Sequence, residues 1–269
     1  MDINIPIRDH YLKFGSWPDF SSRNQFDSYI VQSERHRKFL ILWGQDPKKV
    51  HALGSARFYP DWIKLNLSIL QSSQNKNSIN EKINDETKYR NKLKVVFFLP
   101  HLNCNVNRRS MFNLLSKLSD NESIFMLIKL HTRNQKRFVS SLNKLIDDSI
   151  KIKFVTDIDS PLLIEWSDVV IGFGTSIVIE AMIKNKPLIH CQYLHDNSTI
   201  FDDSQIVHLS KSDDEVMNYL SELTKNISYS KPNQERLNKF LLREVYNFSQ
   251  EINIPERYYE FILKYVKNQ

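Results

Sequence analysis

The sequence predicts an α/β protein built around a doubly wound, parallel, Rossmann-like sheet. From residue 92 onward, short apolar segments alternate with amphipathic helical segments. The apolar segments are continuous rather than alternating, which is typical of parallel strands covered on both faces. The 269 residues are 41% hydrophobic and 25% charged, so the chain is an ordinary globular protein rather than a disordered or collagen-like one.

The first 70 residues predict a smaller, partial α/β region. Residues 1–25 show no sustained period. The next expected elements are a strand, a helix ending at Gly44, a strand and a second helix, at Phe26–Val31, Ser33–Trp43, Lys49–Leu53 and Ser55–Leu70. Residues 71–91 are polar and cannot bury a core face, so they predict a linker.

The remaining chain predicts a Rossmann-like domain over residues 92–225 and further helices over 226–269. Its expected strands are Leu93–Leu99, Ser123–Leu130, Ile152–Val155, Asp168–Gly172, Pro187–His190 and Ile206–Leu209. Helices are expected between them at Asn107–Leu118, Gln135–Ile146, Pro161–Trp166 and Thr175–Lys184. Ligands of such sheets bind beyond the carboxyl ends of the strands, so the candidate residues are sought in those loops.

A glycine-rich turn that includes Gly174 follows the fourth of these strands. We expect Thr175 and Ser176 to open the next helix, whose free N–H groups and dipole favour a phosphate. Glu180 lies four residues after Ser176 and would contact a ribose hydroxyl on the same face. The alternative is structural, because Thr and Ser are common helix caps and Glu180 is spaced to pair with Lys184.

Basic side chains follow the second strand of the domain. Lys129, His131 and Arg133 are expected to leave the sheet together, with Thr132 between the last two. Arg133 could bind phosphate through two hydrogen bonds, and His131 could donate to phosphate or act as an acid or base. The alternative is a solvated strand end.

Amide and basic residues follow the first strand. Asn103 and Asn107 offer amide contacts, and Arg108 would lie in a first helical turn, where a cation opposes the helix dipole unless an anion is near. These residues are therefore candidates for phosphate binding, with a solvated surface as the alternative.

Composition and charge limit the function classes. Cys104 and Cys191 are the only cysteines and form no zinc pattern, so no metal site is expected. The net charge of +6 comes from scattered Lys and Arg, which favours an anionic ligand or membrane surface and does not indicate nucleic-acid binding. No apolar run approaches the length of a membrane span, so a cytoplasmic protein is expected.

Two of these segments resemble a known group of enzymes. The motif His131-Thr132-Arg133 and the segment WSDVVIGFGTSIVIEAMIKNKPLI at residues 166–189 resemble the C-terminal nucleotide-binding domain of GT-B glycosyltransferases. The closer likeness is to bacterial surface-polysaccharide enzymes, namely the CDP-glycerol glycerophosphotransferases and the Kdo and polysialic acid capsule transferases. The UDP-N-acetylglucosamine 2-epimerases are similar more distantly. In many of these proteins a His-Pro pair and a Ser-Ser or Ser-Thr pair bind the donor's phosphates, and the matching positions here are His131-Thr132 and Thr175-Ser176.

The resemblance implies a GT-B fold and a transferase that moves a sugar or polyol phosphate in surface or capsular polysaccharide biosynthesis. Its donor would be a nucleotide-activated sugar or a CDP-polyol, used as substrate without a cofactor or metal. The acceptor would be a glycan or a lipid-linked molecule. This implies peripheral association with the inner face of the cell membrane and no nucleic-acid partner.

Residues 26–58 resemble the last strand–helix–strand unit of a GT-B N-terminal domain, which usually supplies the acceptor site and often the catalytic base. Only about 90 residues precede the Rossmann-like domain, fewer than the ~150 of a usual domain. Candidates for the catalytic group are His131, Asp9 and His10. Two alternatives stay open: a nucleotide-sugar 2-epimerase, and a catalytically inactive remnant or subunit lacking the acceptor half.

Overall fold

The chain forms two compact units in the computed structural model. The structure describes residues 4–5, 19–73, 90–100, 105–131, 153–196, 198–202, 204–226, 233–248 and 253–267. Unit 1 comprises residues 6–65 and 233–269 together with Met1, and unit 2 comprises residues 2–5 and 66–232. The C-terminal helices therefore cluster with the N-terminal region rather than with the segment that precedes them.

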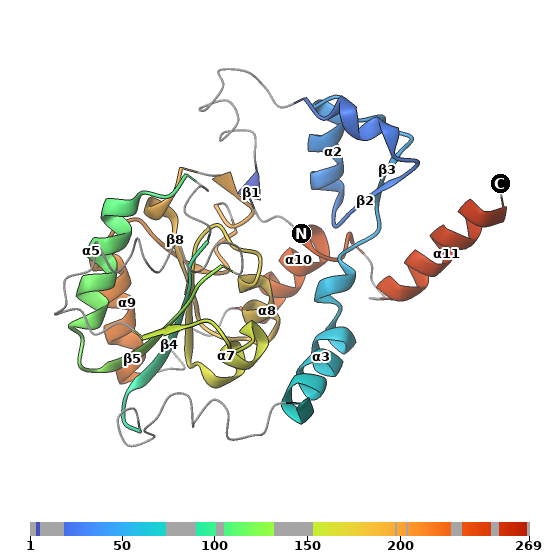
Figure 1. The fold of residues 1–269 in the computed structure, drawn as a ribbon. Coiled ribbons are helices and arrows are strands. Elements are labelled where there is room, and N and C mark those ends of the chain that lie inside the picture. Colours follow the sequence, from blue (N-terminus) through green and yellow to red (C-terminus); the bar gives the residue numbers. More distant parts are fainter. Residues whose placement is uncertain are drawn as a thin grey trace. The chain divides into compact units, whose positions relative to one another are not determined.

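Unit 2 is built on a six-stranded sheet in the order β10-β8-β7-β4-β5-β6, in which each neighbouring pair is parallel (Figure 1). The first strand along the chain, β4, lies centrally beside the fourth, β7. The two halves of the sheet wind outward from this pair, which is the strand order of a doubly wound Rossmann fold. The strands are β4 (Leu93–Phe98), β5 (Ile124–Lys129), β6 (Lys153–Val155), β7 (Val169–Gly172), β8 (Leu188–Cys191) and β10 (His208–Ser210).

Helices cover both faces of this sheet. Helices α5 (Arg108–Ser119) and α9 (Asp213–Lys225) pack against each other on one face, and α7 (Ser160–Trp166) and α8 (Val178–Ile183) do so on the other (Figure 1). The core under α5 and α9 is apolar and fully buried, and it includes Phe97, Ile128, Met111, Leu114 and Leu220. Both faces of the strands are thus out of water, which explains their continuous apolar sequence.

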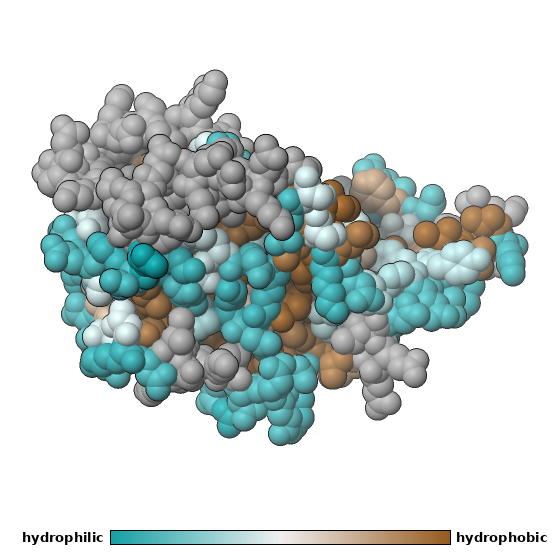
Figure 2. Space-filling view, turned by 90° about the horizontal axis from the view of Figure 1, so that it is seen from below, coloured by the Kyte–Doolittle hydropathy of each residue, from teal (hydrophilic) through white to brown (hydrophobic). Residues whose placement is uncertain are grey.

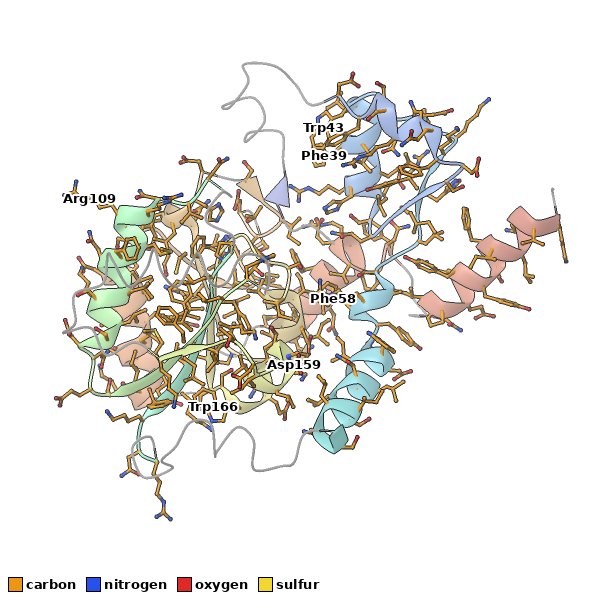
Figure 3. The ribbon with its side chains drawn as sticks, viewed as in Figure 1. Phe39, Trp43, Phe58, Arg109, Asp159 and Trp166 are labelled. Carbon is orange, nitrogen blue, oxygen red and sulfur yellow. The ribbon has the colours of Figure 1, made fainter. Side chains whose placement is uncertain are left out.

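Unit 1 contains a second parallel strand pair, β2 (Tyr29–Val31) and β3 (Val50–Ala52), connected by α2 (Glu34–Leu42). Ser33 caps α2, and Trp43 follows its last residue with a ring 5.7 Å from that of Phe39 (Figure 3). Helices α10 (Gln234–Glu244) and α11 (Ile254–Lys267) complete the unit. The Tyr246 hydroxyl after α10 donates to the Phe58 carbonyl at 2.9 Å, so the C-terminal segment is fixed to the N-terminal one.

Most predicted elements are present within a few residues of their expected bounds. One difference lies after β3, where a 3-10 helix at Ala56–Phe58 precedes α3 (Pro60–Ser73) instead of one continuous helix. Pro60 begins the second helix because its fixed φ suits a first helical position. The antiparallel pair β1 (Asn4–Ile5) and β9 (Ser198–Thr199) was not predicted. The helix expected at Gln135–Ile146 lies outside the described residues.

The surface of the described residues is mixed in character (Figure 2). Their exposed large apolar side chains belong to unit 1 and to helix α3, and they are Phe26, Leu42, Trp62, Leu65, Ile69, Phe248, Tyr259, Ile262 and Val266. Within the described part of the chain, no helix has both the length and the apolar character needed to cross a bilayer.

Candidate functional site

The candidate site lies at the carboxyl edge of the unit 2 sheet, where the two halves of the sheet diverge. The strand ends meet there in one row, because Phe98 of β4 pairs with Lys129 of β5 on one side and with Gly172 of β7 on the other. Neighbouring strands are ~4.8 Å apart, so the residues that follow β5 and β7 leave the sheet within ~10 Å of each other. His131 and the turn after Gly172 therefore share one edge.

Gly172 is required by the close packing of the turn that follows β7. A Cβ atom on this residue would lie 2.7 Å from Cγ1 of Val178 and 3.5 Å from Cγ2 of Thr175. Two residues later, Gly174 adopts a φ of +58°, which favours glycine. The turn thus folds back tightly over the end of its strand, and Gly174, Thr175 and Ser176 are all partly exposed.

The prediction that Thr175 and Ser176 open a helix is wrong. Helix α8 begins at Val178, and its N-cap residue Ile177 makes no side-chain capping bond. The N–H of Ile179 donates to the Ser176 carbonyl at 3.2 Å, a three-residue step tighter than an α-helical bond. The two hydroxyl residues therefore belong to a turn, and a six-residue helix contributes little dipole to the site.

Glu180 is nearly buried on α8, with 6% of its surface exposed. Its Oε1 lies 3.5 Å from Nζ of Lys184, and that Nζ lies 3.4 Å from Oε2 of Glu165. The ion pair given as the alternative role of Glu180 is therefore present. A contact with a ribose hydroxyl stays a prediction.

Lys129 does not join the basic group expected at the end of β5. Its side chain is buried, and its Nζ donates to the carbonyls of Thr156 at 2.9 Å and Ile158 at 2.7 Å. Burial lowers the pKa of this lysine, while the carboxylates of Asp157 and Asp159 act in the opposite direction. Lys129 thus fastens the loop after β6 to the sheet. His131, two residues further on, is exposed.

The described residues after β4 make mainly structural contacts. Asn107 caps α5, since its side-chain oxygen accepts from the Ser110 N–H at 3.2 Å. Its own N–H donates to the Leu194 carbonyl at 2.8 Å, which joins this loop to the one after β8. Arg108 is exposed as the first residue of α5, and its neighbour Arg109 projects away from the helix (Figure 3). The expected contacts of Asn107 and Arg108 with a phosphate stay predictions.

Five further candidates lie outside the described residues, and these are Asp9, His10, Asn103, Thr132 and Arg133. Cys191 is described, and burial raises the pKa of its thiol, which disfavours the reactive thiolate form. Among the described residues no cluster of His, Cys, Asp and Glu could hold a metal ion.

A buried histidine, which was not predicted from the sequence, lies beside the turn. His190 pairs in register with Gly172 and is fully buried, and within the described part of the chain neither ring nitrogen has a hydrogen-bond partner. Its ring centroid lies 5.4 Å from that of His195 and 5.1 Å from that of Phe201, and His195 stacks on Phe173 of the turn at 5.8 Å. Burial, and secondly the charge of His195, lower the pKa of His190 to about 3. A histidine inside an otherwise apolar strand was the available signal.

Comparisons with known proteins identify the fold. Neither a protein family nor a curated protein matches the sequence. Similar solved structures include Anabaena HepE in complex with UDP and glucose, with a TM-score of 0.57 and 14% identity over 89% of this chain and 64% of that one. The wall teichoic acid polymerase TagF has a TM-score of 0.53 and 16% identity over 93% of this chain and 60% of that one.

A third similar structure is the UDP-GlcNAc 2-epimerase from Neisseria meningitidis bound to UDP-GlcNAc. Its TM-score is 0.50 with 15% identity, over 88% of this chain and 61% of that one. The chain therefore spans about three fifths of the length of these proteins. At such identities the likeness concerns the fold alone, and it confirms the predicted GT-B-type, Rossmann-like α/β fold.

Proposed function

We propose that the chain binds a nucleotide-activated donor at the carboxyl edge of the unit 2 sheet and transfers a sugar or polyol phosphate from it. The observation that carries this proposal is the position of the Gly172–Ser176 turn beside β4, where doubly wound sheets bind nucleotides. The ligands named for similar structures, UDP with HepE and UDP-GlcNAc with the Neisseria epimerase, support a nucleotide diphosphate as the bound group.

In this proposal the turn stabilises the leaving group. An acceptor hydroxyl attacks the anomeric carbon of a sugar donor, or the phosphorus of a polyol phosphate donor. The bond to the nucleoside phosphate breaks, its oxygen keeps the electron pair, and the acceptor's proton passes to a base. Thr175, Ser176 and His131 would donate hydrogen bonds to the departing phosphate, where charge develops. Glu180 would hold the ribose.

The proposal also includes further phosphate contacts, a catalytic group and an acceptor. Asn103, Asn107, Arg108, Thr132 and Arg133 would add phosphate contacts, and Asp9, His10 and His131 stay candidates for the catalytic group. The acceptor would be a surface or capsular glycan or a lipid-linked molecule at the inner face of the cell membrane. The similarity to TagF, which is named as a wall teichoic acid polymerase, supports an acceptor of this kind.

A nucleotide-sugar 2-epimerase is the second candidate, favoured by the likeness to the Neisseria enzyme. The two activities are separated by incubating the protein with UDP-GlcNAc or CDP-glycerol, with and without a glycan or glycerol phosphate acceptor. Transfer predicts nucleotide release only when acceptor is present, together with a lengthened acceptor. Formation of the 2-epimer of the sugar without acceptor would instead establish the epimerase, and a folded protein that does neither would contradict both.

A further inference from the structure

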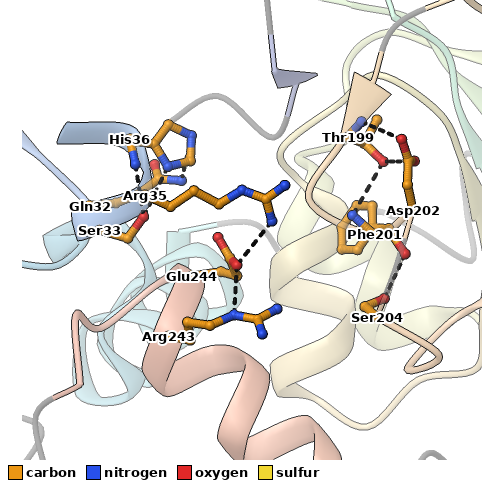
Figure 4. Close-up of polar contacts among 10 residues, drawn as sticks. All are labelled: Gln32, Ser33, Arg35, His36, Thr199, Phe201, Asp202, Ser204, Arg243 and Glu244. Carbon is orange, nitrogen blue, oxygen red and sulfur yellow. Dashed lines mark hydrogen bonds and ion pairs between the residues drawn. The ribbon is translucent and has the colours of Figure 1, made fainter. Parts of the chain in front are cut away.

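A polar cluster in unit 1 lies at the carboxyl end of β2 and has no part in the site described above. Ser33 and Gln32 follow this strand and contact the ring of His36 (Figure 4). Arg35 follows in the first turn of α2, and its side chain extends to the carboxylate of Glu244 at the end of α10. The cluster thus joins the two segments that form unit 1.

Two arginines converge on one oxygen of Glu244. Nη1 of Arg35 lies 3.2 Å from Oε1, and Nε of Arg243 lies 2.8 Å from the same atom (Figure 4). The Glu244 side chain is fully buried, while the two arginine side chains are 33% and 51% exposed. The group carries a net charge of +1, and its positive members are the ones that reach solvent.

Both guanidinium groups retain unused donors. A guanidinium has five N–H bonds. Within the described residues, Arg35 donates a hydrogen bond only through Nη1 and Arg243 only through Nε. Arg37, on the same helix, shows what a purely structural arginine does here: its three nitrogens donate to the Val50 carbonyl, the Pro47 carbonyl and Glu34. The contacts with Glu244 hold Arg35 and Arg243 in place and leave some of their N–H donors without a partner among the described residues.

The buried carboxylate explains why both arginines stay in place. Among the residues that the structure describes, none hydrogen-bonds to Oε2 of Glu244. Among the described residues, the two guanidinium groups are the charges that offset this buried group, so loss of both would leave an uncompensated buried carboxylate. Two fixed guanidinium groups with free donors form a pre-organised receptor for a tetrahedral oxyanion, because each can present paired N–H groups to it.

The position of the cluster also fits a binding site. β2 and β3 are parallel, with Val31 opposite Ala52, so their carboxyl ends meet at the edge where α/β sheets bind ligands. We propose that Arg35 and Arg243 bind a phosphate ester on unit 1. The proposal rests on the proposed function in taking this group as part of the acceptor, namely a polyol phosphate or a phospholipid headgroup.

The test uses the full chain and calorimetric binding of sn-glycerol 3-phosphate, with UDP and CDP titrated into the same preparations. Arg35→Gln and Arg243→Gln should each weaken glycerol phosphate binding about tenfold or more, the effect of losing hydrogen bonds to a charged group. Arg236→Gln, an exposed arginine on the same helix α10, is the matched control and should change nothing. Each variant leaves Glu244 one arginine, and its thermal melting is recorded to check the fold.

The outcomes separate this site from the donor site. Glycerol phosphate binding should survive Ser176→Ala, and nucleotide binding should survive both arginine variants. The unit 1 site would be overturned by a folded protein that binds neither glycerol phosphate nor phosphatidylglycerol vesicles. It would also be overturned if all folded variants bound these ligands equally well. A folded protein that binds glycerol phosphate but no nucleotide would count against the proposed function and would still support the unit 1 site.

A vesicle arm identifies the source of the phosphate ester. Phosphatidylglycerol and phosphatidylcholine vesicles are sedimented with the protein and with the same variants. Arginine-dependent binding to the phosphatidylglycerol vesicles supports the site with a lipid headgroup as its ligand. Arginine-dependent binding of glycerol phosphate without vesicle binding supports it with a soluble polyol phosphate.

Discussion

At the scale of single residues, Gly172 determines whether the turn after β7 can form. A methyl group on this residue would lie 2.7 Å from Cγ1 of Val178, a contact that real side chains do not make. Gly172→Ala should therefore destabilise the protein by about 1–3 kcal/mol, the usual cost of overpacking. We expect nucleotide affinity to fall as well, because Thr175 and Ser176 move with the turn.

The residue that the new methyl group would meet provides the control for this prediction. Val178→Ala removes the atom that the new methyl group would meet, so the double variant Gly172→Ala with Val178→Ala should recover nucleotide affinity relative to Gly172→Ala alone. Calorimetry with the three variants checks this. A Gly172→Ala protein that binds nucleotide as tightly as the wild type would contradict the role given to the turn.

Burial of His190 should make the stability of the protein depend on pH. Its pKa falls from 6.5 to about 3 on folding, so the unfolded chain takes up a proton at a pH where the folded protein does not. The stability that this group confers is therefore complete above pH 6.5 and is lost as the pH falls toward 3. Between pH 7 and pH 5 the loss amounts to about 2 kcal/mol.

His190→Phe removes the titrating group and keeps a ring of similar size. Urea denaturation at pH 7 and pH 5 should show the wild type losing about 2 kcal/mol more unfolding free energy than the variant over that interval. A matching loss in both proteins would show that the burial of His190 does not contribute to acid sensitivity.

At the scale of elements, the end of β5 separates a structural residue from a candidate binding residue. Lys129 fastens the carbonyls of Thr156 and Ile158, whereas His131 is exposed at the edge of the sheet. Lys129→Met should lower the free energy of unfolding by about 1–3 kcal/mol, since the buried bond to Ile158 and the part-buried bond to Thr156 lose their donor. His131→Ala should leave stability nearly unchanged and weaken nucleotide binding. The reverse pattern in denaturation and calorimetry would contradict these assignments.

Elements were predictable where the local pattern is strong. The strands of unit 2 were found because they are buried on both faces, and Ser33 and Gly44 marked the ends of α2. The start of α8 was not predictable, since a positive φ at Gly174 and the packing of Val178 on Gly172 are tertiary features. The return of residues 233–269 to unit 1 depends on long-range contacts such as Tyr246 with Phe58, which no local pattern reveals.

The candidate site was predictable to a similar extent. The alternation of strands and helices identified the carboxyl edge and placed His131 and the glycine-rich turn there. The sequence could not show that Lys129 turns toward the loop after β6, because the carbonyls it binds are 27 and 29 residues away along the chain. The cluster of Arg35, Arg243 and Glu244 was missed for the same reason, as Arg35 lies 209 residues before Glu244.

At the scale of the whole molecule, the proposed chemistry is divided between two units. The Rossmann-like unit 2 would hold the donor, and unit 1 would hold a phosphate ester of the acceptor. Both sites lie at the carboxyl ends of parallel strands, and both would recognise phosphate, which agrees with the net charge of +6. The epimerase alternative needs only the first of these sites.

The most direct test of the central claim is calorimetric titration of the purified chain with UDP, CDP, CMP, GDP and ADP. We expect one pyrimidine nucleotide to bind, and we expect Ser176→Ala together with His131→Ala to weaken its binding at least about tenfold, because hydrogen bonds to phosphate are lost. Ser119→Ala, at the far end of α5, should leave the affinity unchanged. A folded protein that binds none of these nucleotides, or a folded double variant that binds as tightly as the wild type, would contradict the account.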